Sequence, residues 1–327
     1  MGMQNAINHI NTLIAPLIIG LEPDVVVIDQ RMIELDGTEN KSRLGANAIL
    51  PISIAACKAQ AIQHNIEVYD LIAALSNNES CGMPLPLFNI FNGGLHAAGS
   101  LVIQEYMIVP LEAESFAQAV MIGATVTHAI KLALKRKNLC TATGDEGGFV
   151  SHTMNDQEVL GFIAEVIAHV EQEVQSPIGI ALDVAASHLY DQEMDRYRIN
   201  NDYFTRNDLI TWYAHLVQEF PICAIEDGLD QDDADGWQEL RAALSDDVHI
   251  IADDICATNP QIIHDIGQLV ADAVIIKPNQ VGTVTETIQA INVSKERELN
   301  HIISHRSGET NDYFIADLAV GSCAPFI

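Results

Sequence analysis

The chain has 327 residues, of which 48% are hydrophobic, so it can hold one large domain with a sizeable core beside a smaller domain. Its 45 acidic and 16 basic residues give a formal net charge of −29, which argues against nucleic acid or an anionic membrane as a partner. No run approaches the roughly 18 apolar residues of a membrane span, and the start lacks the order of a signal peptide. Six cysteines are scattered without a CxxC pair, so we expect reduced thiols and a cytoplasmic protein.

Residues 1–83 have the periodicity of helices, with apolar residues recurring three and four positions apart. An alanine-rich helix is predicted over 43–64, where Pro51 must kink the helix or mark a restart. The polar stretch 75–86, with its glycine and prolines, predicts a domain boundary. We therefore expect one helical domain over 1–83 and a second domain over 84–327.

The second domain begins with two apolar segments on either side of a glycine-rich loop over 87–110, a pattern that favours a hairpin. The loop glycines do not follow the dinucleotide-binding spacing. Helices are predicted over 115–137 and 156–174. From residue 178 onward, short apolar runs alternate with helical segments, which is typical of parallel strands buried on both faces. This alternation predicts an α/β fold with a (β/α) barrel of roughly 250 residues, and 324–327 read as the beginning of another strand.

Four of the predicted strands end in a charged residue. The runs IGIALD, ICAIE and VHIIAD end in Asp183, Glu226 and Asp253, and the run AVIIK ends in Lys277. Parallel strands of a barrel would gather these side chains on one rim, the carboxyl-end face where barrels place their active sites. Each carboxylate alone could be a helix N-cap, but the series with a lysine in the next position favours a joint site. Three oxygen ligands without His or Cys suggest magnesium or manganese.

Three loop residues have a structural as well as a functional interpretation. Glu146 stands among glycines and could be an ordinary turn residue, and His96 could be a surface loop histidine. Arg306 alone could form a salt bridge of little energetic value at the rim. Because Ser307 and Gly308 follow it directly after a predicted strand, a phosphate site is favoured there.

Taken together, these segments resemble the enolase family. The matching strings, in the family order over nearly the whole chain, are LDGTENKSRLGANAIL, NIFNGGLHAAG, IQEYMIVP, GDEGGF, ALDVAAS, IEDGLDQDD, ADDICATNP, KPNQVGTVTE and SHRSGETNDYFIADLAVG. The resemblance implies an enolase-type (β/α)8 barrel preceded by the helical part of an N-terminal capping domain. In the family register the chain starts after a β-rich segment that carries a mobile lid loop. Ile327 stands one position before a second active-site lysine, so we expect a barrel incomplete at its eighth strand.

The resemblance also implies an activity: the magnesium-dependent, reversible dehydration of 2-phospho-D-glycerate to phosphoenolpyruvate in glycolysis. It gives the Mg²⁺ ligands as Asp183, Glu226 and Asp253, with Lys277 as general base and Glu146 as general acid. The residues that it places at the substrate are His96, Gln104, Glu105, His305, Arg306 and Ser307. Enolases are homo-oligomers, so the resemblance also implies self-association.

Two alternatives stay open beside this activity. One is a non-catalytic, enolase-like scaffold that binds a metal or a partner, since the lid loop and the second lysine are not in the sequence. The other is a different dehydratase or racemase of the superfamily, which would share the carboxylates but hardly the loops. For the enolase reaction, the pKa of Lys277 must be lowered by burial or a neighbouring cation, and that of Glu146 raised by the surrounding anions.

Overall fold

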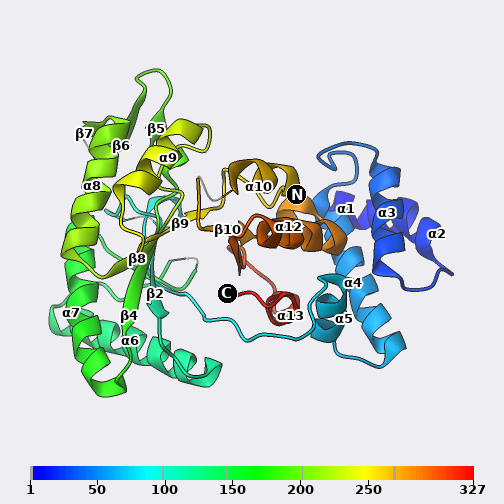
Figure 1. The fold of residues 1–327 in the computed structure, drawn as a ribbon, viewed down its shortest axis with the longest axis horizontal. Coiled ribbons are helices and arrows are strands. Elements are labelled where there is room, and N and C mark those ends of the chain that lie inside the picture. Colours follow the sequence, from blue (N-terminus) through cyan, green and yellow to red (C-terminus); the bar gives the residue numbers. More distant parts are fainter. Residues whose placement is uncertain (1–2, 98, 145, 201, 268–269) are drawn as a thin grey trace.

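The computed structural model describes residues 3–97, 99–144, 146–200, 202–267 and 270–327 of the chain. Helices α1–α5 gather at one end of the molecule, and strands β2, β4, β8 and β9 with helices α6–α9 lie at the other (Figure 1). Helices α12 and α13 lie between these two groups, where α12 contacts α3 and α4, and α13 contacts α5.

The N-terminal region is helical, as predicted. Its elements are α1 (Met3–His9), a π-helical turn (Ile10–Ile14), α2 (Ala15–Ile18), α3 (Val25–Asp36), α4 (Ala46–His64) and α5 (Val68–Leu75). Asp24 caps α3 by accepting a hydrogen bond from the amide of Val27, and Gly37 ends the helix in the left-handed conformation. Helix α4 continues through Pro51, so the restart considered for that position is wrong.

Polar contacts join the helical region to the first turn of α12 (Val284–Glu296). The first amides of a helix have no partner within the helix itself. Here the amide of Val284 donates to Ser53 Oγ at 2.8 Å, and that of Thr285 donates to Asp29 Oδ2 at 3.0 Å. Side chains of α3 and α4 therefore satisfy the N-terminus of a helix that belongs to the barrel.

One eight-stranded sheet runs in the order β11-β10-β9-β8-β4-β2-β1-β3. Strand β2 pairs antiparallel with β1 and with β4, and the other neighbours pair in parallel. The strands are β1 (Phe88–Asn92), β2 (Glu105–Pro110), β3 (Phe149–Val150), β4 (Ile178–Asp183), β8 (Ile222–Glu226), β9 (His249–Ala252), β10 (Ala273–Ile276) and β11 (Asn300–Ile303). Both the predicted hairpin and the predicted series of parallel strands are confirmed.

The hydrogen bonds between the regular strands do not close the sheet into a complete barrel. The last described residues lie between β11 and the segment just before β1. Phe326 forms parallel bridges with Ile302 of β11 and with Leu85, just before β1. The amide of Leu87 donates to the carbonyl oxygen of Ile327 at 2.8 Å. This segment therefore occupies the position where the eighth strand was predicted to begin.

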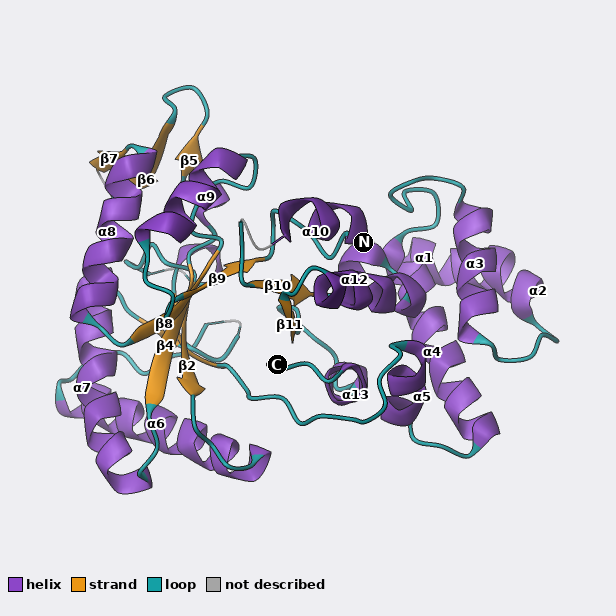
Figure 2. Ribbon diagram, viewed as in Figure 1, coloured by secondary structure: helices purple, strands orange, loops and turns teal. Residues whose placement is uncertain are grey.

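Helices cover the outer face of the sheet (Figure 2). They are α6 (Phe116–Arg136), α7 (Asp156–Val174), α8 (Arg206–Glu219), α9 (Ala234–Ala243), α10 (Pro260–Ile266), α12 and α13 (Phe314–Ser322). The short helix α11 (Pro278–Val281) contacts α4 and α12. In the described part of the chain, α6 is the one helix long and apolar enough to cross a membrane. It packs against β2 and α7 and buries Ile122, Val126 and Ile130, so core packing accounts for the apolar residues on one of its faces.

A second, three-stranded sheet lies between β4 and α8 and was not predicted. It consists of β5 (Tyr190–Asp191), β6 (Arg196–Ile199) and β7 (Asp202–Phe204), paired antiparallel. Strand β6 alternates exposed Arg196 and Arg198 with buried Tyr197 and Ile199. This period of two is the signal of a half-buried strand, but four residues are too few to stand out beside longer runs.

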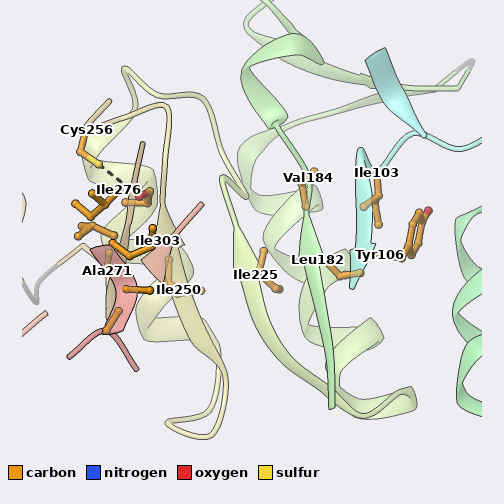
Figure 3. Close-up of a cluster of buried hydrophobic side chains, with 14 of the residues drawn as sticks. Ile103, Tyr106, Leu182, Val184, Ile225, Ile250, Cys256, Ala271, Ile276 and Ile303 are labelled. Carbon is orange, nitrogen blue, oxygen red and sulfur yellow. Dashed lines mark hydrogen bonds between the residues drawn. The ribbon is translucent and has the colours of Figure 1, made fainter. Parts of the chain in front are cut away.

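Strand residues alternate between two buried layers. One layer, between strands and helices, includes Leu182, Ile225, Ile250 and Ile276, which Figure 3 shows along successive strands. The other layer faces the interior of the barrel and consists of Met107, Val109, Ala181, Ala224, Ile251, Ala273, Ile275 and Ile302. Because successive side chains of a strand point to opposite faces, this parity decides which residues reach the barrel mouth.

The buried histidine His301 makes folding sensitive to acid. Its side chain is only 3% exposed, and burial beside Lys295 lowers its pKa to about 4 from about 6.5 in an unfolded chain. Between these values the unfolded state binds the additional proton, so stability is complete above pH 6.5 and falls as the pH approaches 4. The loss has an upper limit of about 3 kcal/mol.

We therefore expect His301→Gln to flatten the decline in unfolding free energy between pH 7 and pH 4.5, measured by urea denaturation. The exposed His64 provides the matched control, His64→Gln, which should leave the slope unchanged. Parallel pH profiles for the parent and His301→Gln would show that other groups cause the acid sensitivity.

Candidate active site

A cavity of about 290 Å³ opens at the carboxyl ends of the parallel strands. All eleven residues predicted for the site line it: His96, Gln104, Glu105, Glu146, Asp183, Glu226, Asp253, Lys277, His305, Arg306 and Ser307. Residues that are up to 211 positions apart in the chain, from His96 to Ser307, thus share one site.

Strand parity explains how the four charged strand ends enter this cavity. Ala181, Ala224, Ile251 and Ile275 point into the barrel, and the next residue of each inward series is two positions further on. Those positions are occupied by Asp183, Glu226, Asp253 and Lys277. The side chains inside the barrel are therefore apolar, and the next inward-facing side chains, at its mouth, are charged.

Three of these four side chains form direct polar contacts. Lys277 Nζ forms a very short ion pair with Asp253 Oδ2, and Gln280 Nε2 donates to Asp253 Oδ1 at 3.2 Å. Gln104 Nε2 donates to Asp183 Oδ2 at 2.9 Å. In the described residues no hydrogen bond reaches the carboxylate of Glu226, although this residue is only 7% exposed.

The balance of charge at this rim fits a bound cation. Asp183 and Glu226 are register partners on adjacent strands, and both repel Asp253. Burial raises the pKa of Asp183 to about 7 and holds that of Glu226 well above its ordinary value. A buried carboxylate without a donor is costly, and a hard divalent cation with oxygen ligands would remove that cost.

Lys277 does not have the lowered pKa that the sequence led us to expect. Burial acts in that direction, but attraction to Asp253, Glu226 and Asp183 is stronger and raises the pKa above its ordinary value. The expectation considered burial and neighbouring cations, whereas three anions surround this lysine. The protein groups by themselves therefore keep Lys277 charged.

A second group of side chains forms on the opposite wall of the cavity. His96 Nδ1 lies 3.0 Å from Glu105 Oε1 and 3.4 Å from Glu146 Oε2. Ser307 Oγ donates to Glu146 Oε1 at 2.6 Å, and His305 Nε2 lies 3.5 Å from the same oxygen. Glu146 is thus the centre of this group and not an isolated turn residue.

The expected rise in the pKa of Glu146 is also wrong for the chain by itself. Burial raises this pKa, but hydrogen bonds from His305, His96 and Ser307 outweigh burial and hold it well below the usual range. Burial instead raises the pKa of the neighbouring Glu105 to about 8, despite the opposing contact with His96. The two neighbouring carboxyl groups therefore share one proton near neutral pH.

The glycine-rich loop that carries His96 is fixed at both ends. A Cβ atom on Gly93 would lie 2.4 Å from the carbonyl oxygen of Ile103, so only glycine permits this close return of the loop. Beyond it, Asp156 Oδ1 accepts hydrogen bonds from the amides of Val102 and Ile103 and from the hydroxyl of Tyr106. These contacts hold the residues directly before and after Gln104 and Glu105.

Several cavity residues were not found from the sequence. Asp227 and Asp254 lie beside Asp253, and ligand atoms of these three residues lie within 4.8 Å of one another. His96, Glu105 and Glu146 form the other such group among the described residues, whereas the predicted metal trio does not form one. The sequence signal for Asp227 and Asp254 was the second acidic residue in each of the strings IEDG and ADDI.

The predicted phosphate-binding residues lie at the outer rim of the cavity. Arg306 is exposed, and its Nη1 donates to Asn279 Oδ1 at 3.2 Å. Ser307 contacts Glu146, and His305 faces the same carboxylate. Arg306 follows β11 in the chain and lines the cavity. Its guanidinium group has further hydrogen-bond donors available.

The sheet order, the inward-facing carboxylates and the partly buried lysine define a (β/α)-barrel protein with an acidic site at the end where barrel enzymes carry out their chemistry. The family model described as "Enolase, C-terminal TIM barrel domain" matches residues 80–327, and "Enolase, N-terminal domain" matches residues 1–72. The curated enolase of Anaplasma phagocytophilum (strain HZ) is 41% identical over 321 residues, which cover 98% of this chain and 74% of that protein. The chain belongs to the enolase family, the phosphopyruvate hydratases.

Proposed function

We propose that the chain catalyses the magnesium-dependent, reversible dehydration of 2-phospho-D-glycerate to phosphoenolpyruvate, a step of glycolysis. The observation that carries this proposal is the single cavity that collects all eleven predicted residues. Membership of the enolase family supports the substrate and a divalent metal. With this activity we expect a cytoplasmic location and assembly into homo-oligomers.

Lys277 acts as the base that removes the proton from carbon 2 of the substrate. Loss of this proton creates a second negative charge on the substrate carboxylate, which is prohibitive without nearby positive charge. Asp183, Glu226 and Asp253 would hold a divalent cation, which would supply that charge and weaken the attraction that keeps Lys277 protonated. The position of the partly buried Lys277 among these carboxylates supports this role.

Glu146 acts as the acid that protonates the departing hydroxide. Near neutral pH the proton is shared by Glu105 and Glu146, whose carboxyl groups are hydrogen-bonded to each other. His96 and His305 hold Glu146 in place, and Arg306 with Ser307 supplies the donors for the substrate phosphate.

Turnover of 2-phosphoglycerate by the purified chain with magnesium, followed as phosphoenolpyruvate absorbance, tests this function. We expect activity that disappears with a chelator and returns with Mg²⁺. Asp253→Asn should reduce the rate by about 10²-fold or more, because it replaces a charged metal ligand by a neutral amide of the same shape.

Binding without turnover would favour the alternative of a non-catalytic, enolase-like scaffold. If the folded chain binds a divalent cation and 2-phosphoglycerate but forms no phosphoenolpyruvate, the catalytic proposal is wrong. Circular dichroism and thermal unfolding of the same preparation distinguish this outcome from a chain that has not folded.

A further inference from the structure

One buried hydroxyl group joins the proposed base to a proposed metal ligand. Thr258 Oγ1 accepts a hydrogen bond from the amide of Lys277 at 2.9 Å and donates to Gln280 Oε1 at 2.5 Å. The side-chain amide of Gln280 in turn donates to Asp253 Oδ1 at 3.2 Å. The chain of contacts runs from the backbone of the base, through Thr258 and Gln280, to the carboxylate of the ligand.

The turn that places Thr258 is an unusual one. Thr258 is fully buried, and both Ala257 and Thr258 have positive φ angles, of 43° and 57°. Left-handed backbone is rare for a β-branched residue and persists only where the surrounding structure imposes it. The amides of Cys256 and Ala257 both donate to the carbonyl oxygen of Asp253, so the turn folds back on that residue.

These contacts leave the Asp253 carboxylate little freedom to rotate. Gln280 holds Oδ1, Lys277 holds Oδ2, and the backbone amide of Asp253 donates to Asp227 Oδ1 at 2.9 Å. Asp227 fixes the next amide as well, because its Oδ2 accepts from Asp254 at 2.9 Å. Residues that form hydrogen bonds to a metal ligand commonly set the orientation of that ligand and its affinity for the metal.

We propose that Thr258 and Gln280 are positioning residues that fix the Asp253 carboxylate for a divalent cation and tie its position to that of Lys277. This inference rests on the metal site of the proposed function. If the turn had a purely structural role, loss of the Thr258 hydroxyl group would lower folding stability but would leave the affinity for a divalent cation unchanged.

Equilibrium binding of Mn²⁺, measured by electron paramagnetic resonance, tests the proposal without any turnover. Thr258→Val keeps the shape of the side chain and removes the hydroxyl, whereas Thr258→Ser keeps the hydroxyl. We expect Thr258→Val to weaken Mn²⁺ binding by about 10-fold or more and Thr258→Ser to restore most of the affinity. Gln280→Leu, at a half-buried position less critical for folding, should weaken binding to a similar extent.

Thr287→Val is the matched control, because Thr287 is equally buried and its hydroxyl donates only to the carbonyl oxygen of Thr283. It should bind Mn²⁺ as the parent does. If Thr258→Val and Gln280→Leu also match the parent, while Asp253→Asn loses affinity, the positioning role is wrong and the metal site stands. If the parent itself does not bind Mn²⁺, the metal site of the proposed function is wrong, and the positioning role with it.

Discussion

Replacing Lys277 by alanine should abolish the exchange of the carbon 2 proton of 2-phosphoglycerate with solvent. The lysine is the one amine among the side chains that line the described cavity, and it lies against the carboxylate of Asp253, a proposed metal ligand. A positioned general base contributes about 10²- to 10⁴-fold to a rate, so both exchange and dehydration should fall by at least about 10²-fold. Exchange is measured by proton NMR in deuterated water.

Glu146→Gln separates the two proton transfers. It should block dehydration yet leave exchange at carbon 2, because the amide keeps the shape of the acid but cannot deliver a proton. Together the two variants assign one step to each wall of the cavity. Exchange that persists in Lys277→Ala, or that disappears in Glu146→Gln with the fold intact, would contradict this division of roles.

Asp156→Ala should have the largest effect on stability among the substitutions considered. Asp156 is 4% exposed, and its Oδ1 alone accepts hydrogen bonds from two buried amides and the hydroxyl of Tyr106. An unsatisfied buried donor costs about 1–3 kcal/mol. We expect a loss of about 3–5 kcal/mol in the free energy of unfolding, measured by urea denaturation.

Asp156→Asn is the matched variant, since its amide oxygen can accept the same three hydrogen bonds. It should cost less than half as much as alanine, and Tyr106→Phe, which removes one of the three donors, should cost about 1 kcal/mol. Equal losses for Asp156→Asn and Asp156→Ala would mean that the negative charge near the N-terminus of α7 stabilises the fold, and not the three contacts.

The sequence was sufficient to predict the barrel and the four charged strand ends at its mouth, because both depend on short-range patterns. The loop residues of the site, such as His96 and Glu146, were predicted from the resemblance to the enolase family. Successive side chains of a strand point to opposite faces. In the strand ends IALD and AVIIK, Asp183 and Lys277 therefore lie two positions after an inward-facing residue. The predicted bounds of α7, residues 156–174, agree with the structure, in which the helix begins at a capping box at Asn155.

The electrostatic state of the site could not be predicted in this way. The pKa of Lys277 depends on the sum of the burial cost and the attraction of carboxylates on other strands, and only their distances decide which is larger. The contacts of Thr258 depend on two successive left-handed residues, for which the string ATNP contains no glycine as a signal. The proton shared by Glu105 and Glu146 likewise follows from the burial of two carboxyl groups side by side.

The contacts at the start of α12 have a consequence for how the chain folds. Family comparison separates the chain into segments 1–72 and 80–327, yet Ser53 and Asp29 of the first segment satisfy amides of the second. Separating the segments would expose those amides together with the partly buried ion pair of Lys41 and Glu286. Because separation would break all of these contacts, we expect the two segments to unfold together in one transition.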